Sequence, residues 1–434
     1  MDTIIWYINL IRVIVMNFLA AIEITRQLIN DIIFLCETRT KPTYFTRSNS
    51  KMDFQSLILF QLNFVKKSIQ IELDEFFHRI QGSDMGITKQ AFSEARKKIS
   101  PLAFIQLANA IICWFYAKND FKTFKGYRLC AIDGSFLEIN NSKRLREAFG
   151  YIDNGNVKIA RALAAGIYDI ENDMMITAKI TQYTTGEREL AMQLIEQLKG
   201  LGLKRDLILF DRGYPSKAFI AYLEKNNINY LMRVKKGFLK AIEEAKHPDQ
   251  IVEIQVDKKT IKVRVLRFVL NSGEEECLIT NVIDESFTVQ DFKELYFKRW
   301  GIEVKYDELK NRFQIENFTG DTKLAVEQDF YASIYLSNMV ALAKQDANKE
   351  IAVKNEGKNF KYDYKVNANI LIGKLKDSMV LMLLEDNKEK RSRLLNQIMR
   401  EVSRNVIPIR PGRSNVRKMG LKSNKHPINQ KRCL

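Results

Sequence analysis

The sequence has few of the residues that most metal and disulfide sites need. It contains three histidines in 434 residues, none at metal-ligand spacing, and five cysteines that lie far apart without a CxxC pair. Neither a zinc cluster nor a disulfide framework is therefore indicated, and a reducing compartment is favoured. The phosphate-binding loops GxxxxGKS/T and GxGxxG are also absent, so nothing indicates energy-coupled nucleotide chemistry. Any metal site must rest on carboxylates.

The composition is that of a globular, basic protein. Apolar residues make up 46% and charged residues 28%, which excludes a disordered tail protein and a collagen-like fibre. At roughly 150 residues per domain, the chain is long enough for several domains. The 69 Lys and Arg residues exceed the 52 Asp and Glu residues and leave a net charge of +17. This excess favours a polyanionic partner, above all double-stranded DNA, because binding releases counterions from phosphates.

The N-terminal segment 1–50 is apolar and predicted to be helical. Residues 4–22 resemble a membrane anchor, but Asn9, Arg12 and Asn17 interrupt them. A central arginine costs about 2.5 to 3.5 kcal/mol on insertion scales. The pattern therefore favours buried or interface helices, and no membrane partner is expected. An N-terminally anchored membrane protein remains an alternative.

Residues 51–124 have the apolar spacing of a small helical domain. Thr88 is placed to cap a helix through QAFSEARKKI, and Ser100-Pro101 is placed to separate that helix from the next. Two short helices joined by a turn suit helix-turn-helix DNA binding, although most such pairs are only packing units. The candidates for groove contact are Lys89, Gln90, Ser93 and Arg96.

Residues 125–234 change to short runs of strand type. They predict an antiparallel meander that feeds a βαβ unit, which together form a mixed α/β sheet with flanking helices. The predicted strands are 128–133, 162–170, 174–181, 206–211 and 228–234, and the predicted helices are 186–198 and 216–224.

The remainder of the chain divides into four segments. Residues 235–288 predict a β insertion, and the lysines and arginines on it suit either DNA contact or an ordinary exposed sheet face. Helices resume in 289–345 and continue in 346–399. The last segment, 400–434, carries ten Lys or Arg residues against one acid and is predicted to be a flexible, DNA-attracted tail or a solvated end. The basic residues noted in the insertion are Lys258, Lys259, Lys262, Arg264 and Arg267.

Two acids stand where predicted strands end. Asp133 closes the hydrophobic run RLCAID, and Asp211 closes DLILFD and is followed by Arg212. In open α/β sheets, ligands bind beyond the carboxyl ends of the strands, so these acids could share a hard cation. Aspartate after a strand is also a common turn or cap residue.

A third acid lies on a predicted helix over residues 290–313. Tyr296, Arg299, Glu303 and Lys310 fall within a stripe about 60° wide at about 100° per residue. Leu295, Ile302, Leu309 and Phe313 form a separate apolar seam. The stripe suits a metal ligand beside phosphate-binding cations, and it equally suits an exposed face stabilised by ion pairs.

The spacing Tyr296-x2-Arg299-x3-Glu303-x6-Lys310 matches the YREK motif of the group-four insertion-sequence transposases. These are DDE transposases with a β insertion before the final acid. Asp133 in AIDGS resembles the first acid of that family, and Asp211 in LILFDRGY resembles the second. The resemblance covers roughly residues 87–343.

The resemblance implies a ribonuclease-H-like core, formed by 125–234 and 289–345, in which Asp133, Asp211 and Glu303 are catalytic and bind two Mg²⁺ ions, with Mn²⁺ as a possible substitute. It implies cleavage at the terminal inverted repeats of an insertion sequence and strand transfer into target DNA by a cytoplasmic, nucleoid-associated protein. A homodimer is expected because two DNA ends must be joined. The residues expected to contact DNA are Tyr296, Arg299, Lys310, Arg212, Lys89 and Arg96.

Two matters stay open at this point. Members of this family often cut the second strand through a hairpin, and the sequence does not choose among Phe238, Phe268 and Phe287 as the residue for a flipped base. The alternative function is a non-catalytic, basic DNA-binding protein or regulatory relative of a transposase, for which the net charge suffices.

Overall fold

The computed structural model describes residues 16–47, 50–63, 67–81, 86–118, 120–153, 155–256, 259–270 and 273–410. The chain divides into two compact units, one of Met1–Ile111 with Asn311–Leu434 and the other of Ile112–Lys310. Each unit is described by itself. The finer division into seven segments stays a prediction, and the basic tail beyond residue 410 lies outside the described residues.

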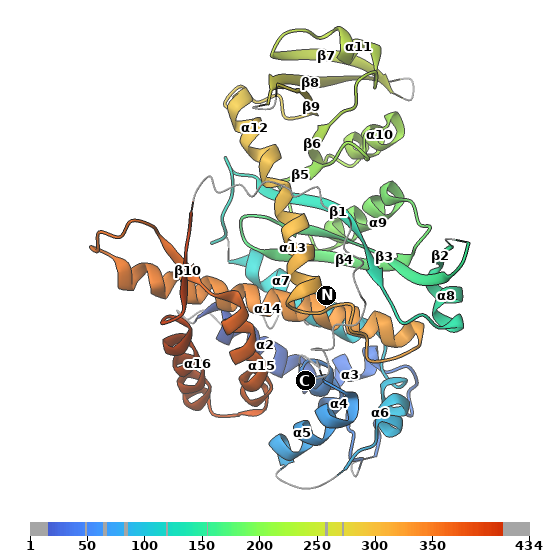
Figure 1. The fold of residues 1–434 in the computed structure, drawn as a ribbon, viewed down its shortest axis with the longest axis vertical. Coiled ribbons are helices and arrows are strands. Elements are labelled where there is room, and N and C mark those ends of the chain that lie inside the picture. The colour runs from blue at the N-terminus through green and yellow to red at the C-terminus, as the bar shows by residue number, and fades with distance from the viewer. Residues whose placement is uncertain are drawn as a thin grey trace. The chain divides into compact units, whose positions relative to one another are not determined.

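The unit Ile112–Lys310 is built on one mixed, nine-stranded sheet (Figure 1). Strands β4, β3 and β1 are antiparallel neighbours, and β5 and β6 then add to β1 in parallel. The predicted meander followed by a βαβ unit is thereby confirmed. The strands of this part are β1 (Arg128–Glu138), β2 (Tyr151–Asp153), β3 (Lys158–Asp169), β4 (Met174–Gln182), β5 (Asp206–Phe210) and β6 (Asn229–Arg233).

The β insertion extends the same sheet. β9 pairs antiparallel with β6, and β8 and β7 follow outward. Alternate residues of β7 are exposed, as expected for a strand with one solvated face. Lys258 lies outside the described residues. The three strands are β7 (Asp249–Val256), β8 (Lys259–Val269) and β9 (Glu275–Thr280).

Helices cover this sheet because each buries one apolar stripe. α9 packs on β3 and β4, and the leucines and isoleucine of its buried face are fully enclosed. Ser216 caps α10, and Thr288 with Asp291 forms a capping box at α12. The helices are α8 (Lys143–Phe149), α9 (Glu187–Gly200), α10 (Lys217–Lys225), α11 (Lys240–Glu244), α12 (Val289–Lys298) and α13 (Trp300–Asn311).

The other unit is almost entirely helical. The apolar N-terminal region contains a pair of helices, and Asp346 accepts hydrogen bonds from the first backbone N–H groups of α2. In the part of the chain that is described, no helix is long and apolar enough to cross a membrane. Residues 1–15 of the suspected anchor lie outside it. The elements are α2 (Asn17–Ile29), α3 (Ile32–Thr38), α4 (Phe54–Gln61), α5 (Ile69–Gln81), α6 (Lys89–Arg96), α7 (Leu102–Ala117, which runs across the boundary), α14 (Lys323–Asn355), α15 (Ala368–Leu384), α16 (Lys388–Val402) and the strand pair β10 (Tyr364–Val366) and β11 (Val406–Pro408).

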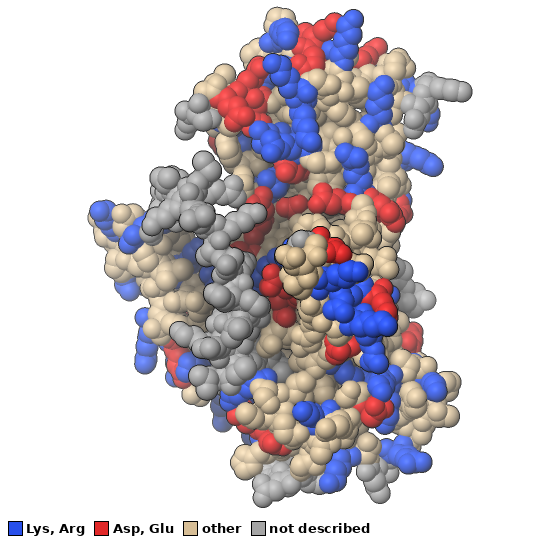
Figure 2. All heavy atoms as spheres, turned by 45° about the vertical axis from the view of Figure 1, so that its right-hand side comes forward, with Lys and Arg blue, Asp and Glu red and all other residues tan. Residues whose placement is uncertain are grey.

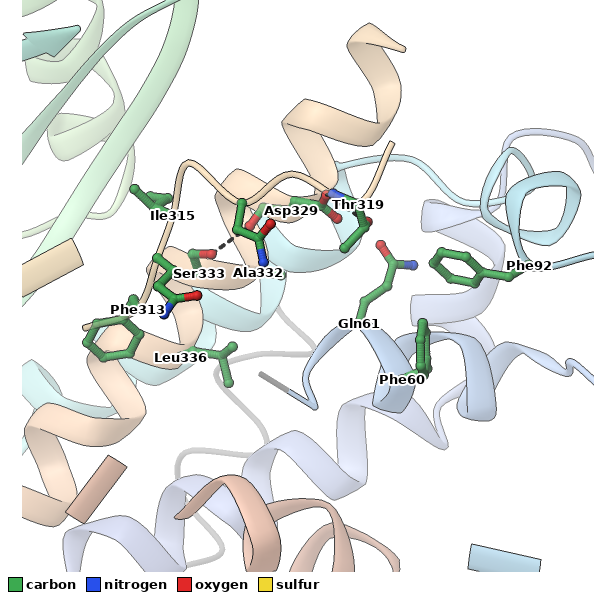
Figure 3. Close-up of a pocket in the computed structure, with 12 residues that line it drawn as sticks. Phe60, Gln61, Phe92, Phe313, Ile315, Thr319, Asp329, Ala332, Ser333 and Leu336 are labelled. Atoms are coloured by element: carbon green, nitrogen blue, oxygen red, sulfur yellow. Dashed lines mark hydrogen bonds between the residues drawn. The ribbon is translucent and has the colours of Figure 1, made fainter. Parts of the chain in front are cut away.

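A small polar cavity lies inside this helical unit (Figure 3). It has a volume of about 40 Å³ and is lined by residues of α4, α6, α14 and the segment that leads into α14. Both amide atoms of Gln61 and Oε1 of Gln314 are buried there without a hydrogen-bond partner. A cavity of this size and polarity suits a few ordered waters, so we assign it a packing role.

Candidate acidic site

The first acid, Asp133, lies inside a strand and not at its end. β1 continues to Glu138 because it keeps pairing with β3, where Asp133 stands opposite Gly166. Its pairing with β5 stops at Ala131, so Asp133 comes just beyond the point where the parallel neighbour ends. The predicted strand end at Asp133 was wrong, but the position relative to β5 is the one that a sheet-edge site needs.

The carboxyl group of Asp133 is only 23% exposed and accepts a hydrogen bond of 2.9 Å from the backbone N–H of Gly134. Burial raises the pKa of Asp133 to about 6; the Gly134 hydrogen bond and Arg299 lower it, and the charges of Glu303 and Glu187 raise it. Asp133 therefore loses its proton close to neutral pH and not near pH 4.

The second acid, Asp211, follows β5 directly, as predicted. The backbone N–H of Tyr214 donates to its carbonyl oxygen at 3.1 Å and closes the turn. Its carboxylate accepts a hydrogen bond of 3.3 Å from the hydroxyl of Tyr296. Burial raises the pKa of Tyr296, so its phenol stays protonated and donates. Tyr296 therefore belongs to the site through its hydrogen bond to the Asp211 carboxylate.

The predicted helix 290–313 is two helices joined at Arg299 (Figure 1). Tyr296 is near the end of α12, and Glu303 stands in the first turn of α13, where the helix dipole favours a carboxylate. The separate apolar seam predicted on this helix is confirmed, since all four of its residues are buried.

Arg299 lies among the three acids. Its Nη2 donates to Glu303 Oε1 at 3.0 Å, and its Nη1 is 3.8 Å from Asp133 Oδ2. The charge of Asp211 is also close enough to act on the guanidinium. The side chain is only 5% exposed, yet Nε and Nη1 have no hydrogen-bond partner. The structure therefore brings Asp133, Asp211 and Glu303 together around one buried cation.

The remaining predicted site residues have mixed positions. Lys310 is half-buried and donates to the carbonyl oxygen of Phe136 on β1 at 2.7 Å. Arg212 is exposed beside Asp211. In the helical unit, Lys89 is exposed at the start of α6, and Thr88 caps that helix as predicted.

Arg96 does not face solvent. It is 4% exposed, and its guanidinium donates to Gln328 at 2.8 Å and to Asp329 at 2.7 Å. A helix-turn-helix assignment from spacing alone could not detect these partners, because α14 lies more than 220 residues later in the chain. With its donors used inside the unit, Arg96 is left out of the DNA-contacting set that we propose below.

The three acids suit a hard cation by ligand type, because carboxylate oxygens are the ligands that Mg²⁺ prefers. Within the described ranges, no three His, Cys, Asp or Glu side chains are grouped so that they could hold a metal ion together. The three acids are arranged around Arg299 and not around a common point.

Several neighbours of the site were missed by the sequence argument. The hydroxyl of Tyr306 donates to the backbone carbonyl of Asp133 at 3.0 Å and fixes that part of β1. Arg188 donates to the carbonyl oxygens of Gly213 and Tyr214 at 2.8 and 2.9 Å. The run TTGEREL does mark the start of a helix, because a glycine precedes two acids in the first helical turn, and Arg188 lies between those acids.

The surface seen in Figure 2 carries groups of both signs. Basic side chains form several separate groups with acidic ones between them. Among the described residues visible on this face, the basic side chains are therefore not gathered into one continuous patch. A charge count alone does not locate a DNA-binding surface.

Comparison with known proteins identifies the segment that carries this site. Residues 124–339 match the family model described as the transposase DDE domain. No curated protein matches the sequence. Among solved structures, the chain is similar to the cryo-EM structure of a piggyBac transposase synaptic complex with hairpin DNA, with a TM-score of 0.44 and 12% identity, over 95% of this chain and 89% of that chain.

Proposed function

We propose that the protein is a DDE transposase of the group-four insertion-sequence type, with a ribonuclease-H-like core. The observation that carries this proposal is the convergence of Asp133, Asp211 and Glu303 around Arg299. These acids come from β1, the end of β5 and α13, which are far apart in sequence. The match of residues 124–339 to the transposase DDE domain supports the same conclusion.

Asp133, Asp211 and Glu303 would hold the divalent ions, Mg²⁺ or its substitute Mn²⁺. When bound, a pair of such ions polarises both the attacking and the leaving oxygen of an in-line phosphodiester displacement. The residues of the chain then have separate tasks. Tyr296 holds the Asp211 carboxylate through its hydroxyl, and Tyr306 fixes the backbone at Asp133.

The cations near the acids would bind the DNA backbone. Arg299 has two unused N–H groups, and a phosphate could accept from both in the bidentate way that guanidinium groups favour. Exposed Arg212 and Lys310 beside β1 would add positive charge along the bound strand. In the helical unit, exposed Lys89 would contact DNA separately. The proposed substrates are the terminal inverted repeats and target DNA, held by a homodimer in the cytoplasm in association with the nucleoid.

The test uses plasmid DNA that carries the sequences flanking the gene. The expected result is nicking and strand transfer in Mg²⁺ and none in EDTA. Asp133→Asn, Asp211→Asn and Glu303→Gln are each expected to abolish cleavage and leave DNA binding largely intact. The control is Asp307→Asn, an exposed acid one turn after Glu303 on α13, which is expected to cleave normally.

Two outcomes would decide against the proposal. Cleavage that persists in any of the three variants would remove that acid from the site. Salt-sensitive DNA binding without any nicking by the unmodified protein would instead favour the non-catalytic DNA-binding alternative.

A further inference from the structure

A short segment of the helical unit combines aromatic rings with cations. Residues 358–365 have the sequence KNFKYDYK and lead from α14 into β10, which packs against α14 (Figure 1). β10 pairs with β11, and the backbone N–H of Ile409 then donates to the carbonyl oxygen of Asp363 at 2.7 Å. This pairing brings the next residue, Arg410, to the same place. Residues 358–365 together with Arg410 are called the aromatic-basic patch.

The rings of the aromatic-basic patch are held in place without being covered. Phe360 is 49% exposed, whereas Val366 on β10 is only 4% exposed and therefore contributes to the core. The ring of Phe360 meets the ring of Tyr364 edge to face, with 5.5 Å between the centroids. A ring that only served packing would be buried as Val366 is. Phe360 instead leaves π surface open to a partner that can stack on it.

Two cations of the patch lie over a neighbouring ring. The Nζ atom of Lys361 is 5.5 Å from the centroid of the Tyr362 ring, and the Cζ atom of Arg410 is 5.8 Å from the same centroid. The negative face of an aromatic ring attracts such cations. Positive charge is thus fixed directly beside half-exposed aromatic surface, although the two cations are far apart in the sequence.

The patch has an excess of positive charge. It contains four cations and one acid, Asp363, which gives a local net charge of 4 − 1 = +3. All four cations are exposed, and among the described residues none of them forms an ion pair. Nearby Lys354, at the end of α14, is by contrast paired with Glu350. An unneutralised surface of this kind attracts a polyanion. The four cations are Lys358, Lys361, Lys365 and Arg410.

We propose that the aromatic-basic patch binds an unpaired DNA strand, with bases stacked on Phe360 and Tyr362. Its phosphates are held by Lys361, Lys365 and Arg410. The occupant follows from the two features together, because a positive surface follows the backbone of a single strand and aromatic rings accept its bases whatever their sequence. Bases in a duplex already stack on one another and cannot reach the rings. The inference goes beyond the proposed function, and it does not depend on the acids, which lie in the other unit.

The experiment measures the affinity of the full chain for a labelled oligothymidine of about 20 nucleotides, which exceeds the site sizes of single-strand binding folds. A duplex of the same length is the comparison, and fluorescence anisotropy in EDTA is the readout. Phe360→Leu keeps an apolar side chain but cannot stack, so it is expected to weaken single-strand binding about fivefold or more and to leave duplex binding unchanged. Phe360→Trp keeps an aromatic ring and is expected to bind as the unmodified protein does.

A second pair of variants tests the phosphate contacts. Lys361→Gln combined with Arg410→Gln is expected to reduce the slope of log affinity against log salt concentration by about 1.4, since each contact with a single strand contributes about 0.7. The matched control is Lys390→Gln combined with Arg393→Gln. It removes the same charge from α16, where both cations are paired with nearby acids, and it is expected to leave the slope unchanged.

Four results would overturn the inference. They are a lack of oligothymidine binding by the unmodified protein, unchanged single-strand affinity in Phe360→Leu, an equal loss of single-strand and duplex affinity in that variant, and a change in its sedimentation, which would assign the patch to contact between two copies of the chain. Phe360→Leu is expected to keep its melting temperature because the ring is about half exposed, so weakened binding does not reflect unfolding. Each of these results leaves the proposed function standing, because cleavage in Mg²⁺ tests that function separately.

Discussion

Replacing Arg299 with methionine is expected to lower the free energy of unfolding by about 2 kcal/mol at pH 8 in EDTA. Methionine is long and apolar, so it occupies much of the same buried volume without the charge. The change leaves Asp133, Asp211 and Glu303 close together without a cation. Their mutual repulsion is then relieved only by water or by protonation.

The magnitude follows from opposing contributions. The ion pairs at 3.0 Å and 3.8 Å each attract with about 4 kcal/mol at the effective dielectric constant of a protein near its surface. Burial of the guanidinium costs several kcal/mol, and each unbonded N–H group costs about 1 to 3 kcal/mol. Because Glu303 is 35% and Asp133 is 23% exposed, water replaces part of the lost attraction. The loss therefore falls below the roughly 3 to 5 kcal/mol of a fully buried broken pair.

The assay is urea unfolding followed by circular dichroism at pH 8 and pH 5, in EDTA. At pH 5 the difference is expected to shrink, because Asp133, with a pKa of about 6, is then protonated. Lys298→Met is the control. Lys298 is the adjacent exposed cation, paired with Glu171, and its loss is expected to cost less than about 1 kcal/mol. A variant of Arg299 that is as stable as the unmodified protein at pH 8, or whose loss is the same at both pH values, would refute this reasoning.

Three further predictions concern single residues. The folded-state pKa of Asp133 lies above its ordinary value, so ionisation of this carboxyl group destabilises the fold as the pH rises from about 4 to 6. Asp133→Asn is therefore expected to raise the free energy of unfolding by up to about 3 kcal/mol at pH 8 and to leave it unchanged at pH 4. Urea unfolding in EDTA measures this difference. Gly166→Ala places a Cβ 2.6 Å from Met175 Sδ and is expected to cost about 1 to 3 kcal/mol, so an unchanged melting temperature would contradict it. Arg96→Met is expected to cost about 3 to 5 kcal/mol and Lys89→Met less than about 0.5 kcal/mol, as thermal unfolding of the two variants would show.

Much of the sheet could be read from local pattern. The predicted strands and the helices between them are present with shifted ends, because apolar runs and caps act within a few residues. Asp211 follows β5 as predicted. The end of β1 was misplaced because a strand stops where its partner stops, and β3 continues beside it past Asp133.

The helix that carries the third acid shows the limit of periodicity. Spacing placed Tyr296, Arg299 and Glu303 on one stripe, and these side chains do lie next to one another. Spacing did not show that the helix is interrupted at Arg299. Spacing also assigned Arg96 to a DNA groove, whereas distant residues of α14 bind its guanidinium. Local spacing cannot predict contacts between residues that are far apart in the sequence.

The sequence by itself predicted a basic chain with a mixed sheet and three acids whose order and spacing resemble those of a transposase, and it contains no CxxC pair and no histidine pair at metal-ligand spacing. Only the tertiary structure decided that Arg299 lies among those acids. The physical reason is that secondary structure follows from interactions between near neighbours, whereas the electrostatics of a site depend on which charges the folded backbone brings within a few ångströms.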